Sequence, residues 1–217
     1  MIDFLKKIRY QFEQFKLLIK EKGLKLALKD AFYINREMIL VERELDKPLP
    51  KMKKFIDLKL VLLNKGDIEK IKNYEFADKV RKLKSKNYLS KGYNGFFMIK
   101  NNKIIAEQWW VSKKINKRGI PHPDLKWMRR ELKDGEIYAF DLFISPEFRG
   151  SPLTIFFIGS YLMELKKMNF LKIYGCFFTD NIPSLWVHRI FSYNEIGKVM
   201  RHRFFCLEIK NKMLCLS

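Results

Sequence analysis

The sequence predicts an α/β (α+β) protein with a mixed central sheet of about six to seven strands flanked by helices. Residues 137–144 and 171–178 are apolar runs rich in β-branched and aromatic side chains, and each has the length of a buried strand. Residues 153–168 between them have helix length, and Pro152 stands at a first-turn position, where its missing N–H costs nothing. This order favours a parallel strand pair joined by a right-handed crossover.

The composition is that of a folded protein with one main domain. Of 217 residues, 47% are hydrophobic and 15% aromatic, which is too many for a disordered chain. We expect a helical N-terminal extension and linker over residues 1–50, followed by the main domain over residues 51–217. The cysteines Cys176, Cys206 and Cys215 lack metal-ligand spacing, which favours reduced, packed thiols and no metal site.

The net charge of +20 predicts attraction to anions such as a nucleotide cofactor, nucleic acid or an acidic membrane. An AT-rich genome gives a similar lysine-rich composition, so the charge alone does not choose among these partners. No nucleic-acid recognition motif is present, and a nucleic-acid partner is not expected. The N-terminus shows no signal-peptide pattern, and the longest uncharged run is too short to cross a bilayer. We expect a cytoplasmic protein, with peripheral contact at the inner membrane face as an alternative.

The first 34 residues predict a basic amphipathic helix broken at Gly23. Apolar residues recur in steps of three and four along one face: Leu5, Ile8, Phe12, Phe15 and Ile19. Such a stripe packs on the domain, pairs with a second subunit in a homodimer, or lies on an anionic membrane surface. The residues leave these alternatives open.

Further elements follow in order. Residues 37–44 form a strand or an extended arm, and Pro48 and Pro50 mark a linker. Residues 55–63 alternate as a strand does, and Asp67 is an N-cap for a helix to about Lys86. Residues 96–100 and 103–111 flank Asn101-Asn102 as a β-hairpin. Residues 195–199 and 201–209 complete the sheet as two strands.

Residues 136–198 resemble the GNAT (GCN5-related N-acetyltransferase) superfamily, and the resemblance extends over roughly residues 56–210. The family's pyrophosphate loop, Q/R-x-x-G-x-G/A, aligns with Arg149, Gly150, Ser151, Pro152, Leu153 and Thr154. Its N-x-x-(A/S)-x-x-x-Y-x-x-x-GF segment aligns with residues 181–193. Asn181 and Ser184 match that segment, His188 stands at the tyrosine, and Ser192-Tyr193 replace Gly-Phe. The resemblance implies acetyl-CoA or another acyl-CoA as the donor and an amine, small-molecule or peptide, as the acceptor.

The loop at residues 149–154 is the expected anion seat, because N–H dipoles at a helix N-terminus point toward a bound phosphate. Pro152 replaces a family glycine and has no N–H to donate. The expected donors are therefore the N–H groups of Gly150, Ser151, Leu153 and Thr154, with the hydroxyl of Thr154 as a substitute and Arg149 adding charge.

The resemblance implies that backbone amides polarise the thioester carbonyl where the strand of residues 137–144 bulges, near Leu142, Phe143 and Ile144. Asp141, within the same apolar strand, and Glu136 are the candidate bases for the amine. If Asp141 is buried, its pKa should be raised, which suits a base. The alternative is a carboxylate paired with one of the many lysines.

His188 is the candidate proton donor to the leaving thiolate, since histidine titrates near neutral pH. It also suits packing against the pantetheine arm, and Tyr193 is then the donor. Asn181 and Ser184 are expected to bind that arm, although Asn181 equally suits a helix cap.

The long basic segment at residues 112–134 is expected to form part of the acceptor site, where the family places such elements. Its "HPDLKWM" motif resembles a feature of one branch of the superfamily. His122, Asp124 and Trp127 are the candidate acceptor-binding residues. Alternatively, Pro-Asp caps a short helix and Trp127 packs beneath it.

Three functions are consistent with the residues. The leading one is direct N-acyl transfer from a CoA thioester; an acidic acyl-carrier protein is a second possible donor. A longer acyl chain would fit if the aromatic side chains line a tunnel instead of the core: Trp109, Trp110, Phe140, Phe156 and Phe157. The second function, favoured by Pro152 and Ser192-Tyr193, is a catalytically silent GNAT-fold module that binds an anionic partner or membrane. The third, nucleic-acid binding, rests on charge alone.

Overall fold

The computed structural model describes residues 33–113, 122–128, 130–204, 207–210 and 214–215, together with short N-terminal pieces at residues 12–13, 15–17, 19–20, 23–25 and 28. The described N-terminal residues are helical apart from Gly23, whose positive φ of 80° marks the predicted break. Most of the apolar stripe lies outside the described residues, so its packing or membrane role stays a prediction. No helix in the described part is long and apolar enough to span a membrane.

One mixed sheet runs through the described chain, with the strand order β2-β3-β4-β5-β6-β1-β7-β8 and β9 paired to β7. Among the described strands, β5 and β6 form the one parallel pair, as predicted for the strands on either side of the crossover helix. The α+β architecture is thereby confirmed, and the two short C-terminal strands extend the expected sheet. The strands are β1 (Tyr33–Glu44), β2 (Lys59–Leu63), β3 (Asn94–Lys100), β4 (Lys103–Ser112), β5 (Glu136–Ile144), β6 (Lys172–Phe178), β7 (Asn194–Phe204), β8 (Leu207–Lys210) and β9 (Leu214–Cys215).

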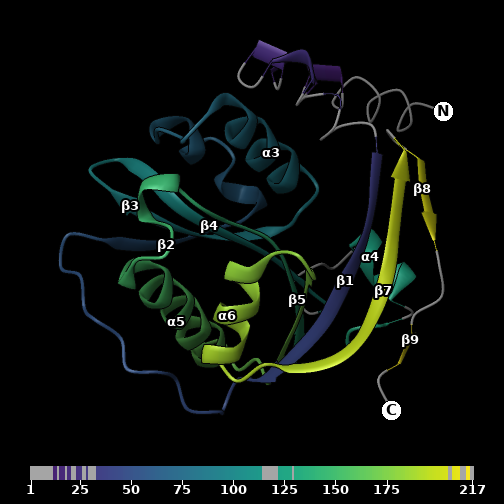
Figure 1. Ribbon diagram of the computed structural model, residues 1–217. Coiled ribbons are helices and arrows are strands. Elements are labelled where there is room, and N and C mark those ends of the chain that lie inside the picture. The colour runs from purple at the N-terminus through teal and green to yellow at the C-terminus, as the bar shows by residue number, and fades with distance from the viewer. Residues whose placement is uncertain are drawn as a thin grey trace.

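Helices cover both faces of the sheet (Figure 1). The crossover helix α5 (Pro152–Lys167) and α6 (Ile182–Ile190) lie beside each other, and residues of both pack with a core that includes Trp110 and Phe157. On the other side, α3 (Lys79–Ser90) and the short α4 (Pro123–Trp127) pack with a second core around Trp109 and Tyr138. The sheet therefore separates two aromatic-rich cores.

The strand nearest the N-terminus occupies an interior position. The sequence assigns residues 37–44 to an extension that ends at residue 50, but β1 pairs antiparallel with β6 on one side and β7 on the other. Its residues Met38, Ile39, Leu40 and Val41 are all buried, as expected for a strand covered on both faces. The expected division at residue 50 is therefore not a division of the sheet.

The helix predicted from Asp67 to about Lys86 is wrong in its first half. Asn64 and Asp67 form a capping box on a single 3₁₀ turn, η1 (Lys65–Asp67), and a second turn, η2 (Lys70–Asn73), follows. Glu75 then bonds through its backbone to Asn102 and Ile104 of the hairpin. This pairing holds the chain extended, so α3 begins only after its own N-cap, Asp78.

The hairpin turn between β3 and β4 and the end of β7 also test boundaries predicted from the sequence. The hairpin is confirmed, with Asn101 and Asn102 at φ values of 46° and 66° in the turn between β3 and β4. The break predicted at Met200 is wrong, because Met200 pairs with Glu37 of β1 and β7 ends only at Phe204.

Candidate functional site

The main feature of the sheet is the place where its parallel strands separate. β5 and β6 pair at only three positions, from Glu136–Lys172 to Tyr138–Tyr174. Beyond Tyr138 the two strands diverge, and a cavity of about 550 Å³ lies between them. Its walls include Ala139 to Leu142 of β5 and Gly175 to Phe178 of β6.

The cavity is lined from both faces of the sheet. From the α5–α6 face come Ile158, Tyr161, Val187, His188 and Tyr193. From the opposite face come Lys84, Tyr88, His122 and Asp124. Two reactants can therefore meet between the strands from opposite sides.

A β-bulge lies in β5 at the cavity. Trp109 pairs with Phe140 and Glu107 with Phe143, so Asp141 and Leu142 together face the single residue Gln108. Asp141 has a φ of +48°. A bulge of this kind is predicted from the sequence near residues 142–144, and it begins one residue earlier; Phe143 and Ile144 have returned to regular pairing.

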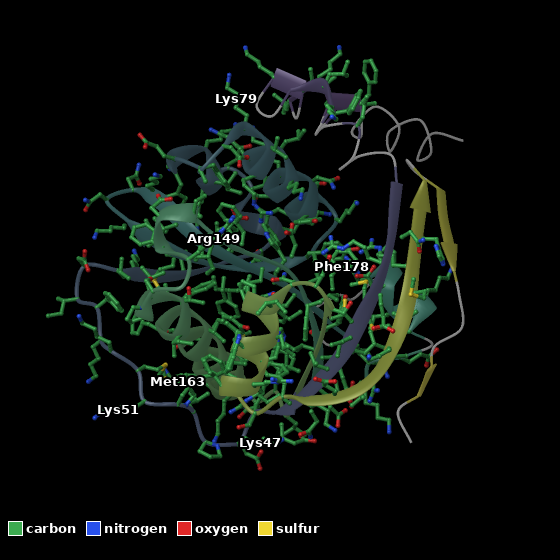
Figure 2. The ribbon with its side chains drawn as sticks, viewed as in Figure 1. Lys47, Lys51, Lys79, Arg149, Met163 and Phe178 are labelled. Atoms are coloured by element: carbon green, nitrogen blue, oxygen red, sulfur yellow. The ribbon has the colours of Figure 1, made fainter. Side chains whose placement is uncertain are left out.

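The chain then turns into α5 at the predicted anion seat, with Arg149 beside the start of the helix (Figure 2). Gly150 has a φ of +70°, and Ser151 is the N-cap, but its hydroxyl donates to the Phe148 carbonyl and does not cap the helix. Pro152 occupies the first turn, as predicted. The helix N-terminus is thus left without a side-chain cap.

Two of the expected donors in this loop have partners within the chain. The N–H of Thr154 donates to the Ser151 carbonyl at 3.0 Å, and that of Ser151 lies 3.4 Å from the Phe148 carbonyl. The Thr154 hydroxyl also donates to the Phe148 carbonyl, at 3.4 Å. Within the described part of the chain, the N–H groups of Gly150 and Leu153 and the Nη atoms of Arg149 have no hydrogen-bond partner, whereas Arg149 Nε donates to the Ile144 carbonyl.

No protein-family model matches the sequence, and no curated protein matches it. Solved structures do match. A GCN5-related N-acetyltransferase from Sphaerobacter thermophilus has a TM-score of 0.51 at 10% identity, over 89% of this chain and 58% of that one. A tandem GNAT protein from the clavulanic acid biosynthesis pathway has a TM-score of 0.51 at 9% identity, over 82% of this chain and 57% of that one. The chain thus spans less than two thirds of the length of either protein.

The fold is that of the GNAT superfamily. In this chain β5 and β6 separate beyond Tyr138, and residues 149–154 follow β5 and lead into α5.

Asp141 has the ion pairs that the sequence left open as the alternative to a base. Burial alone would raise the pKa of its carboxyl, but Lys84 and Arg81 are close enough to hold that pKa down at about 2. Arg81 Nη1 donates to Asp141 Oδ1 at 2.9 Å, and Lys84 Nζ lies 4.0 Å from Oδ2. An ionised, paired carboxylate with this pKa accepts a proton poorly at neutral pH. Asp141 is therefore a carboxylate paired with basic side chains, one of them the lysine Lys84.

Glu136, the other candidate base, lies at the paired end of the two strands. Its carboxylate accepts from the Tyr174 hydroxyl at 2.8 Å and from the Lys133 N–H at 2.8 Å. It is absent from the residues that line the cavity, so its observed role is to close the turn before β5.

His188 and Tyr193 meet at one wall of the cavity, with ring centroids 4.7 Å apart. Burial lowers the pKa of His188 to about 4, against the opposing effect of a hydrogen bond with the Ser184 carbonyl at 2.7 Å. The imidazole is therefore neutral at pH 7 and also stacks on Phe177. Burial raises the pKa of Tyr193 to about 12, so its phenol keeps a proton to donate.

Asn181 has the capping role that the sequence left as an alternative. Its side chain accepts from the Ser184 N–H at 3.2 Å at the start of α6. Both residues nevertheless line the cavity, so this helix end forms part of its wall.

Two of the three predicted acceptor residues lie at the cavity. His122 and Asp124 line the cavity, where the Asp124 carboxylate accepts from the Tyr138 hydroxyl at 2.7 Å. The ring of His122 lies against Phe140, with centroids 4.1 Å apart and the planes tilted by 30°. The short helix of the alternative is present as α4, with Pro123 in its first turn, but its N-cap is His122 and not Pro-Asp. The side chain of Trp127 lies outside the described part of the structure.

The five aromatic residues considered for an acyl tunnel do not line one channel. Trp109 and Phe140 belong to the core beneath α3, whereas Trp110 and Phe157 belong to the core beneath α5, with Phe156 packed against it. Only Phe140 of the five lines the cavity between β5 and β6. The packing alternative is the better description of the other four.

Sequence reasoning missed the groups that set the chemistry of the site. Arg81 pairs with Asp141 from α3, and Tyr161 of α5 lies beside Tyr193. Neither belongs to a motif, and no sequence signal joins α3 to β5. Cys176 lies in the cavity wall 3.1 Å from the Tyr138 hydroxyl, and burial raises its thiol pKa to about 12, so it is a packed thiol as predicted. Among the described residues, no group of His, Cys, Asp and Glu is arranged to hold a metal ion.

Proposed function

We propose that this protein is an acyl-CoA-dependent N-acyltransferase that moves an acyl group, acetyl in the simplest case, directly to an amine. The observation that carries the proposal is the cavity at the separation of β5 and β6, with a β-bulge in its wall and an uncapped helix N-terminus directly after β5. GNAT-fold acetyltransferases among the matching structures support it.

The chain offers suitable groups for both ends of an acyl-CoA. The N–H groups of Gly150 and Leu153 and the side chain of Arg149 suit a pyrophosphate at the start of α5. The parted strands suit a narrow pantetheine arm, because β5 residues beyond Tyr138 have no ladder partner on the β6 side. Pro152 removes one phosphate contact, which weakens this end of the site.

When bound, the donor supplies a thioester carbonyl that a neutral amine can attack. The bulge at Asp141 and Leu142 interrupts the β4–β5 ladder, and backbone N–H groups released there are suited to stabilise the developing oxyanion. As the new C–N bond forms, the C–S bond breaks, and the leaving thiolate takes the hydroxyl proton of Tyr193. The amine's surplus proton passes to water, and water returns a proton to Tyr193.

We assign the acceptor to the opposite face of the sheet, beside Lys84, His122 and Asp124. An amine that enters there approaches the carbonyl from the side away from α5 and α6. Acyl transfer by this route depends mainly on holding the two reactants together.

Thiol release during turnover tests the proposal. The protein is incubated with acetyl-CoA and a panel of amines that includes polyamines, amino acids and peptide N-termini. The proposal expects amine-dependent release of CoA and an equal amount of acetylated amine. Release without acetylated product would be thioester hydrolysis and would contradict it.

A catalytically silent binding module is the second candidate. Pro152, the paired Asp141 and the neutral His188 favour it, because each removes a group that catalysis by this route would use. It predicts acyl-CoA binding with no amine-dependent turnover anywhere in the panel.

A further inference from the structure

The backbone of the β5 bulge has a positive φ at Asp141, a conformation that aspartate adopts more readily than most other residues apart from glycine. Asp141 has a φ of +48°, and non-glycine residues with positive φ are uncommon because the Cβ clashes with the backbone. Such conformations persist where surrounding contacts determine them, often at functional sites. The contacts that hold Asp141 are therefore informative.

Arg81 is the side chain that fixes the Asp141 carboxylate. It is buried, with a side chain only 7% exposed, and its Nη1 donates to Asp141 Oδ1 at 2.9 Å. The same guanidinium binds Glu107 of β4 with two hydrogen bonds, at 3.2 Å through Nε and 2.9 Å through Nη2. One arginine from α3 therefore ties together both strands of the bulge.

Glu107 in turn is fully enclosed and held by other groups. Its Oε2 accepts from the Ser85 hydroxyl at 2.9 Å and from Trp109 Nε1 at 3.1 Å. The fork of Arg81 matches this carboxylate geometry, which a lysine would not reproduce. Glu107 is thus an anchor that fixes the position of Arg81.

The residue opposite the bulge completes the arrangement. The side-chain amide of Gln108 donates to the Phe140 carbonyl at 3.0 Å and to the carbonyl of the next residue in β4, Trp109, at 2.9 Å. These bonds satisfy carbonyl groups where the β4–β5 ladder is irregular. Two bulge residues, Asp141 and Leu142, are left facing the cavity.

We propose that Arg81 is a positioning residue for the acyl-transfer site: anchored on Glu107, it holds the Asp141 carboxylate and so keeps the β5 bulge in place beside the cavity. Asp141 then acts through its backbone conformation and not as a base. The chemical purpose of the bulge rests on the proposed function; the way the bulge is held does not.

A substitution series at Asp141 separates these roles. Glycine adopts positive φ freely, so Asp141→Gly keeps the bulge without any carboxylate. Alanine neither favours positive φ nor binds Arg81, so Asp141→Ala loses the bulge. We expect kcat for acetyl transfer to be about 30-fold lower in Asp141→Ala than in Asp141→Gly, with little difference in KM for acetyl-CoA between the two variants. Equal loss in the glycine and alanine variants would show that the carboxylate itself is needed and would overturn the proposal.

The arginine is tested in a background in which Glu107 is not left as a buried unpaired carboxylate and Lys84 still lies 4.0 Å from Asp141 Oδ2. In Arg81→Met/Glu107→Gln both charges of the anchor are removed together, and we expect the same loss of kcat as in Asp141→Ala. Adding Asp141→Gly to this double variant should restore most of the activity, which a merely destabilised protein would not show. Failure of glycine to rescue a folded double variant would overturn the proposal.

A direct view of the backbone distinguishes failure of this proposal from failure of the proposed function. Crystal structures or NMR dihedral angles of the wild type and the Asp141 variants report φ at residue 141 with no donor present. The proposal expects a positive φ in the wild type and in Asp141→Gly, and its loss in Asp141→Ala. Retention of the bulge in Asp141→Ala would overturn the proposal, whether or not the protein transfers acyl groups.

Discussion

Tyr193 and His188 line the same wall of the cavity but differ in the protons that they carry. Burial keeps the Tyr193 phenol protonated up to a pH of about 12, whereas burial keeps His188 neutral down to a pH of about 4. Tyr161, whose pKa burial also raises, forms a side-chain hydrogen bond with Tyr193. At neutral pH Tyr193, and not His188, therefore carries a proton that is available for the leaving thiolate of the proposed reaction.

Removing that hydroxyl should reduce turnover without affecting donor binding. We expect Tyr193→Phe to lower kcat for acetyl transfer by about 100-fold, with KM for acetyl-CoA nearly unchanged, because a proton donor acts in the transition state. Steady-state kinetics over pH 6–9 would check this, with Tyr74→Phe, a substitution outside the cavity, as the matched control. Full activity in Tyr193→Phe would remove it from the mechanism.

His188 makes the protein sensitive to acid. Its pKa in the folded state, about 4, lies below the unfolded value near 6.5, so the unfolded state binds more protons between these values. The contribution of neutral His188 to the stability of the fold is fully present above about pH 6.5 and is lost as the pH falls toward 4. When the pH is lowered from 7.5 to 5, the free energy of unfolding falls in both proteins. We expect this fall to be smaller in His188→Gln than in the wild type, by on the order of 1–2 kcal/mol.

Urea unfolding at pH 7.5 and pH 5 measures this difference. His122, whose pKa burial also lowers, is present in both proteins, so the comparison isolates His188. Equal losses of stability in the two proteins would mean that His188 is not buried in its neutral form.

Site residues could be predicted only as far as local motifs reach. The positions of Asn181, Ser184, His188 and Tyr193 along the cavity wall follow from their spacing in one segment. The charge state of Asp141 does not, because it depends on Arg81, which lies 60 residues earlier in the chain. Tertiary ion pairs of this kind leave no periodic signal in a single sequence.

At the scale of single elements, α5 carries the donor half of the proposed site. Its N-terminus has no side-chain cap, and its first turn contains Pro152. Both features concern backbone N–H groups, which are the groups that bind phosphate at a helix N-terminus.

Restoring the missing N–H should strengthen donor binding. We expect Pro152→Ala to bind acetyl-CoA about tenfold more tightly, because a hydrogen bond to a charged acceptor contributes more than one between neutral groups. Calorimetry on Pro152→Ala and on Pro146→Ala, which alters a proline outside the loop, provides the comparison. Unchanged affinity in Pro152→Ala would place the phosphate elsewhere.

Elements with strong local signals were predictable. The hairpin turn at Asn101-Asn102 and the proline-started helix α5 agree with the structure within a residue or two. The region between Asp67 and Asp78 was not predictable, because its backbone bonds to a distant hairpin and not to itself. Helix propensity over such a window is a weak guide when tertiary pairing competes.

At the scale of the whole molecule, β1 links the two halves of the sheet. It lies between β6 and β7, and at its end the buried Arg43 donates to the carbonyls of Phe191, Glu44, Lys47 and Pro48. These bonds fix the turn between α6 and β7 that carries Tyr193. The N-terminal part of the chain thus supports the cavity wall.

A protein that lacks residues 1–50 should not fold. Its β6 and β7 would each expose an unpaired edge, and exposed edges favour aggregation. We expect residues 51–217 alone to be insoluble or to show no cooperative thermal unfolding by circular dichroism, and co-expression with residues 1–50 to recover soluble protein. A soluble 51–217 fragment with cooperative unfolding would show that β1 is dispensable.

Binding of acetyl-CoA is the measurement that tests the account most directly. Calorimetric titrations of the full chain and of Arg149→Ala/Ser151→Ala, each at low and high salt, separate a built site from general attraction to a protein of net charge +20. We expect one saturable site that persists at high salt and is weakened in the variant. Absence of binding, or binding that disappears with salt in both proteins, would contradict it.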